Sequence, residues 1–81
     1  MTYEGWTNYD TWNVSLWINN TYNFYTEAVE FMKDNPDKDN PYKAFVTSCG
    51  LSDQATPDGI WYMSPKLNFD ELNDMMRELT S

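Results

Sequence analysis

The sequence predicts an all-α protein: one compact four-helix domain with an irregular or hairpin-like segment before the last helix. Apolar residues recur at spacings of three and four in four separate stretches, which is the periodicity of helices with a buried face. Turn-forming and capping residues bound each stretch. A chain of 81 residues has room for one hydrophobic core, so residues 1–81 are expected to form a single domain.

The expected core is aromatic. Trp, Tyr and Phe make up 17% of the chain, and each buried ring removes about 150–250 Å² from water. The single cysteine, Cys49, cannot form a disulfide within the chain, and the absence of histidine excludes a Cys/His zinc site. We therefore expect large rings to provide the cohesion, with Trp12, Leu16 and Trp17 in the core.

The first helix is predicted within residues 6–20. Asn8 is a suitable N-cap, and Asp10 falls in the first turn, where the helix dipole favours a carboxylate. Apolar residues occupy most of the circumference, which is typical of a helix buried on several sides. They form two stripes, Tyr9–Trp12–Leu16 and Val14–Trp17–Ile18.

The second helix is predicted over residues 21–34 and the third over residues 41–49. Between them, residues 35–41 have the composition of a turn. Asn40 is placed to cap the third helix, and Pro41 occupies its first position, where a missing N–H costs nothing. The expected inward residues are Tyr25, Ala28, Val29 and Met32 on the second helix, and Tyr42, Phe45, Val46 and Cys49 on the third.

Glycine ends the third helix and turn chemistry follows it. Gly50 suits a left-handed helix end, and Leu51 supplies the hydrophobic contact of a Schellman motif. Residues 56–59 form a Thr-Pro-Asp-Gly turn. Two alternatives remain for residues 52–66: a two-stranded hairpin, or an extended loop that packs Trp61 onto the helices.

The last helix has the clearest signals. Asn68 is its expected N-cap, and Glu71 stands three residues on, as in a capping box. Leu67 and Leu72 are spaced for a hydrophobic staple. The inward stripe is Leu72, Met75, Met76 and Leu79.

The charge is strongly negative. Thirteen carboxylates against five Lys and Arg give a net charge of −8, which repels phosphate backbones and anionic lipid and attracts basic surfaces. We therefore expect no direct nucleic-acid binding and no membrane binding. The simpler interpretation is that the charge keeps an aromatic-rich protein soluble. No export signal and no long apolar run are visible, so we expect a cytoplasmic location.

Catalytic and metal-binding patterns are weak, and we expect no catalytic residue, no cofactor and no metal. The lack of histidine removes Ser-His and Cys-His schemes, and Cys49 is expected to be a buried structural thiol. The spacing of Asn35, Asp37 and Asp39 resembles the start of a calcium loop, but the positions that need Gly and Glu hold other residues. A hydrolase built on two carboxylates stays open only if a deep apolar pocket holds them.

Two surface features predict partner binding. The first is an acidic face on the last helix, joined by acidic residues of the second helix in an extended negative surface. The second is excess aromatic surface, including Tyr3 and Trp6, which would favour a self-assembling protein and a homodimer. The candidate partner-binding residues are Asp70, Glu71, Asp74, Glu78, Glu27, Glu30 and Asp34.

Residues 6–18 contain the pattern W-x-N-Y-[DE]-T-W-x-V-x-L-W, which resembles the N-terminal motif of small proteins of phages and other mobile elements. Residues 67–79 resemble the closing segment of that group only loosely. The group brings no established activity, but the resemblance implies a phage-type accessory protein in the host cytoplasm. By analogy it would bind a host protein with a basic surface, as an inhibitor or a DNA mimic.

Overall fold

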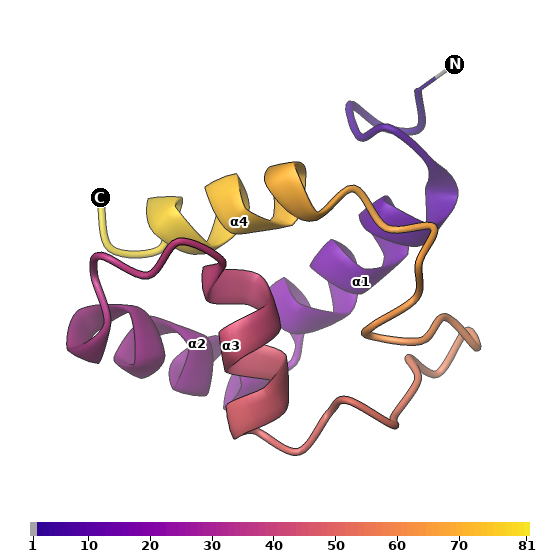
Figure 1. The fold of residues 1–81 in the computed structure, drawn as a ribbon. Helices are drawn as coiled ribbons and strands as arrows, with labels where there is room; N and C mark the ends of the chain where they lie inside the picture. Colours follow the sequence, from indigo (N-terminus) through magenta and orange to yellow (C-terminus); the bar gives the residue numbers. More distant parts are fainter. Residues whose placement is uncertain (1) are drawn as a thin grey trace.

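The computed structural model describes residues 2–81, which fold into four helices (Figure 1). The helices are α1 (Tyr9–Asn20), α2 (Tyr22–Asp34), α3 (Pro41–Ser48) and α4 (Phe69–Glu78). α1 packs against α2 and α4, and α3 packs against the same two helices. Figure 1 shows α4 along one side of the molecule and a long loop connecting α3 to it. The predicted all-α, four-helix fold is confirmed.

The loop between α3 and α4 is irregular. Ala55 and Trp61 share one isolated antiparallel bridge, and no longer strand forms within residues 2–81. The predicted turn is present, because the Gly59 amide donates to the Thr56 carbonyl at 2.8 Å and Gly59 has φ +90°. The expected packing of Trp61 onto the helices is wrong, since this residue is 55% exposed.

The end of α3 is a Schellman motif, as the sequence predicts. The Leu51 amide donates to the Val46 carbonyl at 2.9 Å, and the Gly50 amide donates to the Thr47 carbonyl at 3.2 Å. Gly50 adopts φ +74°, a conformation that residues with a Cβ rarely occupy. Leu51 is buried, so the residue that follows the helix end packs into the hydrophobic core.

The buried face of α1 agrees with the predicted stripes only at Val14 and Ile18. Its buried residues at helical spacing are Thr11, Val14, Ser15 and Ile18. Thr11 and Ser15 carry hydroxyl groups, so a search for apolar stripes does not find their part of this face. Trp12, Leu16 and Trp17 are only half-buried, and their expected place in the core is wrong.

The core uses few of the large rings. Tyr42, Phe45 and Tyr62 are the rings it buries, together with aliphatic and Met side chains from all four helices. None of the four Trp residues is fully buried. Indoles are large, and in a domain with a radius of gyration of 11.6 Å they lie at the edge of the core. The fully or largely buried hydrophobic residues are Val14, Ile18, Ala28, Met32, Tyr42, Phe45, Val46, Leu51, Tyr62, Leu67, Leu72, Met75 and Met76.

The N-termini of α1 and α4 are joined by their capping groups. Asn8 caps α1 by accepting from the Thr11 amide at 2.9 Å, and Asn68 caps α4 by accepting from the Glu71 amide at 3.1 Å. The Asn68 amide then donates to the Thr11 hydroxyl at 3.0 Å, and the Asn68 side chain donates to the Thr7 hydroxyl at 2.9 Å. Glu71 does not complete a capping box as predicted. Its carboxylate instead accepts from the Thr7 amide at 2.9 Å.

The N-terminus of α3 is also capped from α4. Asn40 occupies the N-cap position, but its side chain makes no capping bond. The buried Asn73 of α4 accepts from the Tyr42 amide at 3.0 Å and takes over this role. The phenol of Tyr42 donates to the Tyr62 carbonyl, so its polar group is satisfied inside the core.

A polar anchor fixes the Thr-Pro-Asp-Gly turn to α1. The buried Asn13 donates to the Asp58 carboxylate at 2.7 Å and accepts from the Thr56 hydroxyl at 2.6 Å. Trp17 donates its indole N–H to the same carboxylate at 2.9 Å. These hydrogen bonds to the ionised form lower the pKa of Asp58 below its ordinary value.

Candidate functional site

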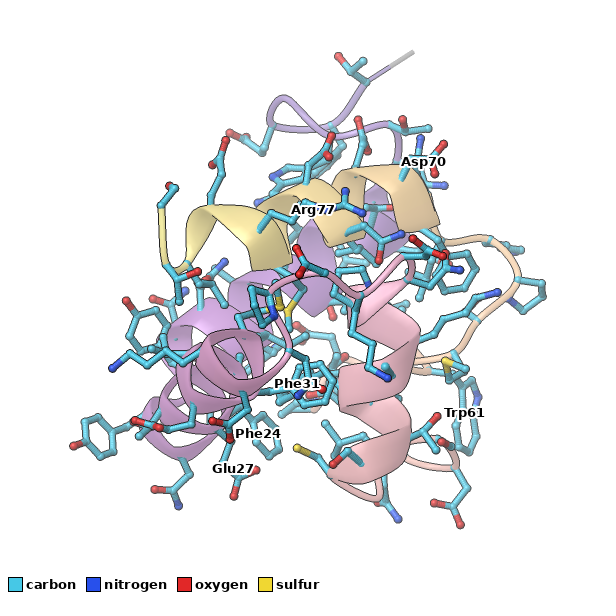
Figure 2. The ribbon with its side chains drawn as sticks, turned by 60° about the vertical axis from the view of Figure 1, so that its left-hand side comes forward. Phe24, Glu27, Phe31, Trp61, Asp70 and Arg77 are labelled. Carbon is cyan, nitrogen blue, oxygen red and sulfur yellow. The ribbon has the colours of Figure 1, made fainter. Side chains whose placement is uncertain are left out.

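The seven predicted acidic residues lie on separate parts of the surface. Glu71, Asp74 and Glu78 line one groove beside α4, whereas Asp70 faces a different depression near Thr7 and Lys66. The acidic residues of α2 line a depression between α2 and α3 that shares no residue with the groove. Figure 2 places Glu27 and Asp70 at opposite ends of the view. The continuous negative surface that the sequence predicts is therefore divided.

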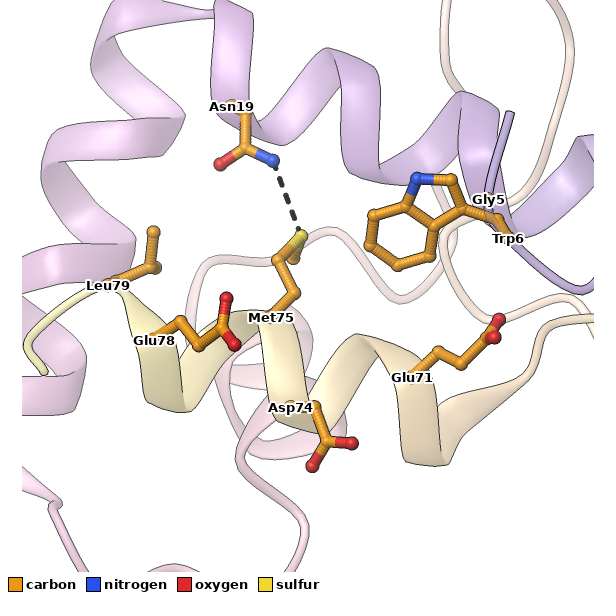
Figure 3. Close-up of a pocket in the computed structure, with 8 residues that line it drawn as sticks. All are labelled: Gly5, Trp6, Asn19, Glu71, Asp74, Met75, Glu78 and Leu79. Atoms are coloured by element: carbon orange, nitrogen blue, oxygen red, sulfur yellow. Dashed lines mark hydrogen bonds between the residues drawn. The ribbon is translucent and has the colours of Figure 1, made fainter. Parts of the chain in front are cut away.

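The groove beside α4, which we call the α4 groove, combines acidic and apolar walls. It is open to solvent and has a volume of about 510 Å³. Figure 3 shows the Trp6 indole between α1 and α4, on the same side of α4 as Met75. The lining residues are Gly5, Trp6, Asn19, Glu71, Asp74, Met75, Glu78 and Leu79.

The three carboxylates of the groove differ in their partners. Glu71 has one oxygen occupied by the Thr7 amide. Asp74 pairs with Arg77 at 3.3 Å, and both side chains are largely exposed. Within residues 2–81, the Glu78 side chain has neither a hydrogen bond nor an ion pair. In Figure 3 the Glu71 and Glu78 carboxylates lie on the Trp6 side of α4, whereas the Asp74 carboxylate points away.

A tight turn places Trp6 in the groove. The Tyr3 amide donates to the Trp6 carbonyl at 2.7 Å, and the Trp6 amide donates back to the Tyr3 carbonyl at 2.8 Å. Both residues between them have positive φ, +51° at Glu4 and +87° at Gly5. Tyr3 packs edge-on against Tyr9, with ring centroids 5.3 Å apart. The turn therefore holds Trp6 through backbone bonds and through contact with α1.

Two of the three acidic residues of α2 also have partners within the chain. Glu27 accepts a hydrogen bond from the Cys49 thiol at 3.2 Å, and Glu30 lies 3.9 Å from Lys33. Burial and the neighbouring carboxylate raise the pKa of Cys49 to about 12. The thiol therefore stays protonated at neutral pH and is a poor nucleophile. Its sequence assignment as a buried thiol is wrong in part, because Cys49 is only half-buried.

Residues 2–81 contain neither a cluster of metal-ligating side chains nor a membrane-spanning helix. In that range, no group of three or more Cys, Asp or Glu side chains is arranged to hold a metal ion. Over the same residues, no helix has the length and apolar character that a bilayer span requires.

A family model for a family of unknown function, DUF7249, matches residues 1–81. The chain belongs to this family. No curated protein matches it, and neither does any solved structure. Because DUF7249 is a family of unknown function, membership assigns no activity to this chain. The candidate site is therefore argued from its geometry alone.

Sequence reasoning found the carboxylates of this DUF7249 chain but missed the side chains that accompany them. Trp6 and Asn19 come from the other end of the chain, and no local pattern places them beside α4. Met75 was predicted as a core residue, and it is buried while also lining the groove. The available signal was Trp6 itself, a large ring that precedes the N-cap and has no place in the helical pattern.

Proposed function

We propose that this protein is a non-enzymatic accessory protein that binds a partner protein through its acidic helix faces. The observation that carries the proposal is the α4 groove, where Glu71 and Glu78 lie on the Trp6 side of α4 and Asp74 also lines the groove, in a chain of net charge −8. Such a surface attracts a basic partner over long range and offers an aromatic contact at short range. The resemblance of residues 6–18 to proteins of phages and other mobile elements supports a host protein as the partner.

Three features support a binding role over a catalytic one. The sequence has no histidine, and the Cys49 thiol is held in its protonated form. Asp74 and Glu78 are exposed on an open groove, which lacks the apolar enclosure that separates the pKa values of a catalytic carboxylate pair. Because the acidic residues are divided among three separate parts of the surface, we favour docking on a basic protein surface over imitation of a continuous row of DNA phosphates.

Salt-dependent capture tests the proposal. The immobilised chain is exposed to lysate of its natural host, and the eluate is identified by mass spectrometry. The captured partner is then produced in pure form, and its affinity is measured between about 0.1 M and about 1 M salt, where the screening length falls from about 10 to about 3 Å. We expect affinity to fall steeply across this range. Equal affinity at both ends would contradict the electrostatic docking mode.

Exposed aromatic residues favour a second candidate, self-association. Tyr22 is 80% exposed, Trp61 is 55% exposed and Tyr25 is 41% exposed. Rings of this kind anchor protein interfaces. Sedimentation velocity across a concentration series tests this candidate, which requires the sedimentation coefficient to rise with concentration. A monomer at every concentration would remove it.

A further inference from the structure

We infer that the α4 groove receives an arginine side chain of the basic partner, with the guanidinium beside Trp6 and attracted by the Glu71 and Glu78 carboxylates, which lie two helical turns apart along the groove. This inference rests on the proposed function and narrows it to one residue type and one groove. The supporting observation is that four groups lie on one side of α4: the Trp6 indole, the Met75 thioether, and the Glu71 and Glu78 carboxylates (Figure 3).

The walls of the groove match the two parts of an arginine side chain. Its methylene stem is apolar and suits Met75 and Leu79, whereas its planar, always charged head suits carboxylates and the face of an indole. Lysine carries the same charge but cannot stack its head on a ring or bind a carboxylate with two parallel hydrogen bonds. We therefore expect the groove to prefer arginine over lysine.

The carboxylates retain free hydrogen-bonding capacity. The Thr7 amide occupies only one oxygen of Glu71 and orients the group. Within residues 2–81, Glu78 has no side-chain partner. Asp74 is paired with Arg77 at 3.3 Å and points away from the Trp6 side of α4, so it is not counted among the carboxylates that attract the guanidinium.

The acidic depression on α2 is a poorer candidate and a good control. Its Glu27 and Glu30 carboxylates already face the Cys49 thiol and the Lys33 ammonium. No Trp lines it, so it lacks the indole that would stack on a guanidinium. Neutralising two carboxylates here changes the net charge as much as neutralising two in the α4 groove.

The test is an NMR titration of the full, ¹⁵N-labelled chain. The probe is a capped Gly-Arg-Gly tripeptide, and the comparison probes are the same peptide with lysine or with neutral citrulline. We expect the arginine peptide to shift the Trp6 indole N–H and the backbone amides of residues 71–79. The lysine peptide should shift them less, and the citrulline peptide should leave them unchanged.

Matched variants locate the site. Glu71→Gln/Glu78→Gln should raise the dissociation constant of the arginine peptide about tenfold, because one charge-assisted contact and one nearby negative charge are lost. The Gln side chain at position 71 still offers an oxygen to the Thr7 amide, so the fold should be kept. Glu27→Gln/Glu30→Gln should change the constant by less than about twofold. Trp6→Leu should weaken binding several-fold, and Trp61→Leu should not. The dispersion of the amide spectrum reports the folding of each variant.

The outcomes separate the inference from the proposed function. Equal weakening by both Glu pairs, or peptide shifts centred on α2, would overturn the groove inference while leaving a general electrostatic role intact. Binding of lysine and arginine peptides with equal affinity would overturn the preference for a guanidinium. If neither cationic peptide binds and the captured partner is insensitive to salt, the proposed function falls as well.

Discussion

The anchor between α1 and the Thr-Pro-Asp-Gly turn gives the sharpest stability prediction, because it depends on one buried amide. Asn13→Ala removes the acceptor of the Thr56 hydroxyl and the donor that reaches Asp58 at 2.7 Å. Asn13 and Thr56 are both buried, with exposures of 0% and 4%. Water therefore cannot replace the lost partner without opening the turn.

The magnitude follows from the hydroxyl that loses its acceptor. The Thr56 hydroxyl still accepts from the Ile60 amide at 3.2 Å, but a buried donor without an acceptor costs about 1–3 kcal/mol, and the alanine also leaves a small void. We expect Asn13→Ala to lower the free energy of unfolding by about 2–3 kcal/mol, a large part of the stability of a small domain. Asn20→Ala is the matched control, since its exposed amide donates only to the Leu16 carbonyl of its own helix.

Urea unfolding followed by circular dichroism measures both variants. Asn13→Ala should unfold at clearly lower urea with an unchanged slope, while Asn20→Ala should stay within about 0.5 kcal/mol of the parent. A loss at Asn13 no greater than that at Asn20 would refute the view that the turn is anchored through this amide.

Three further predictions concern single groups. The pKa of Asp58 is lower in the folded chain than in the unfolded chain, so the ionised carboxylate stabilises the fold. This stabilisation is complete above the ordinary carboxyl pKa and is lost as the pH falls through the lower folded pKa. Asp58→Asn should therefore make the free energy of unfolding, measured in urea, depend less on pH in the acid range. Cys49, with a pKa of about 12, should react with a thiol reagent at pH 8 on the order of a hundredfold more slowly in the folded chain than in urea, and equal rates would contradict its assignment. Gly50→Ala forces a Cβ into φ +74° in otherwise open space, so it should cost about 1 kcal/mol through backbone strain alone; no loss in chemical unfolding would argue against the Schellman end.

Local signals predicted much of the fold. Asn8, Asn68 and Gly50 act on backbone groups within a few residues, and the structure uses each as the sequence indicates. These groups satisfy helix ends whatever the rest of the chain does. For that reason these three helix ends follow from the sequence alone.

Contacts between distant residues could not be predicted in this way. Glu71 has the spacing of a capping box, yet its carboxylate accepts from the Thr7 amide, which comes from the other end of the chain. Asn73 lies within α4, where no local pattern singles it out, and it caps α3. Their roles depend on which helices become neighbours, and helical periodicity does not contain that information.

The candidate site was half predictable for the same reason. Charge and spacing identified Glu71, Asp74 and Glu78, because these lie on one short helix. The indole beside them is brought there by the turn at Glu4 and Gly5, whose positive φ values no helical pattern indicates. The sequence predicts only an acidic surface at this position, whereas the structure shows an acidic groove that is also lined by Trp6.

The most direct test of the account compares two triple variants against the captured partner. Glu71→Gln/Asp74→Asn/Glu78→Gln alters the α4 groove, and Glu27→Gln/Glu30→Gln/Asp34→Asn removes the same charge from α2. Isothermal calorimetry at about 0.1 M salt should give a dissociation constant raised by at least about thirtyfold for the first variant and by less than about threefold for the second. Equal constants for the two variants, or no change in either, would contradict the claim that the α4 groove is the binding surface.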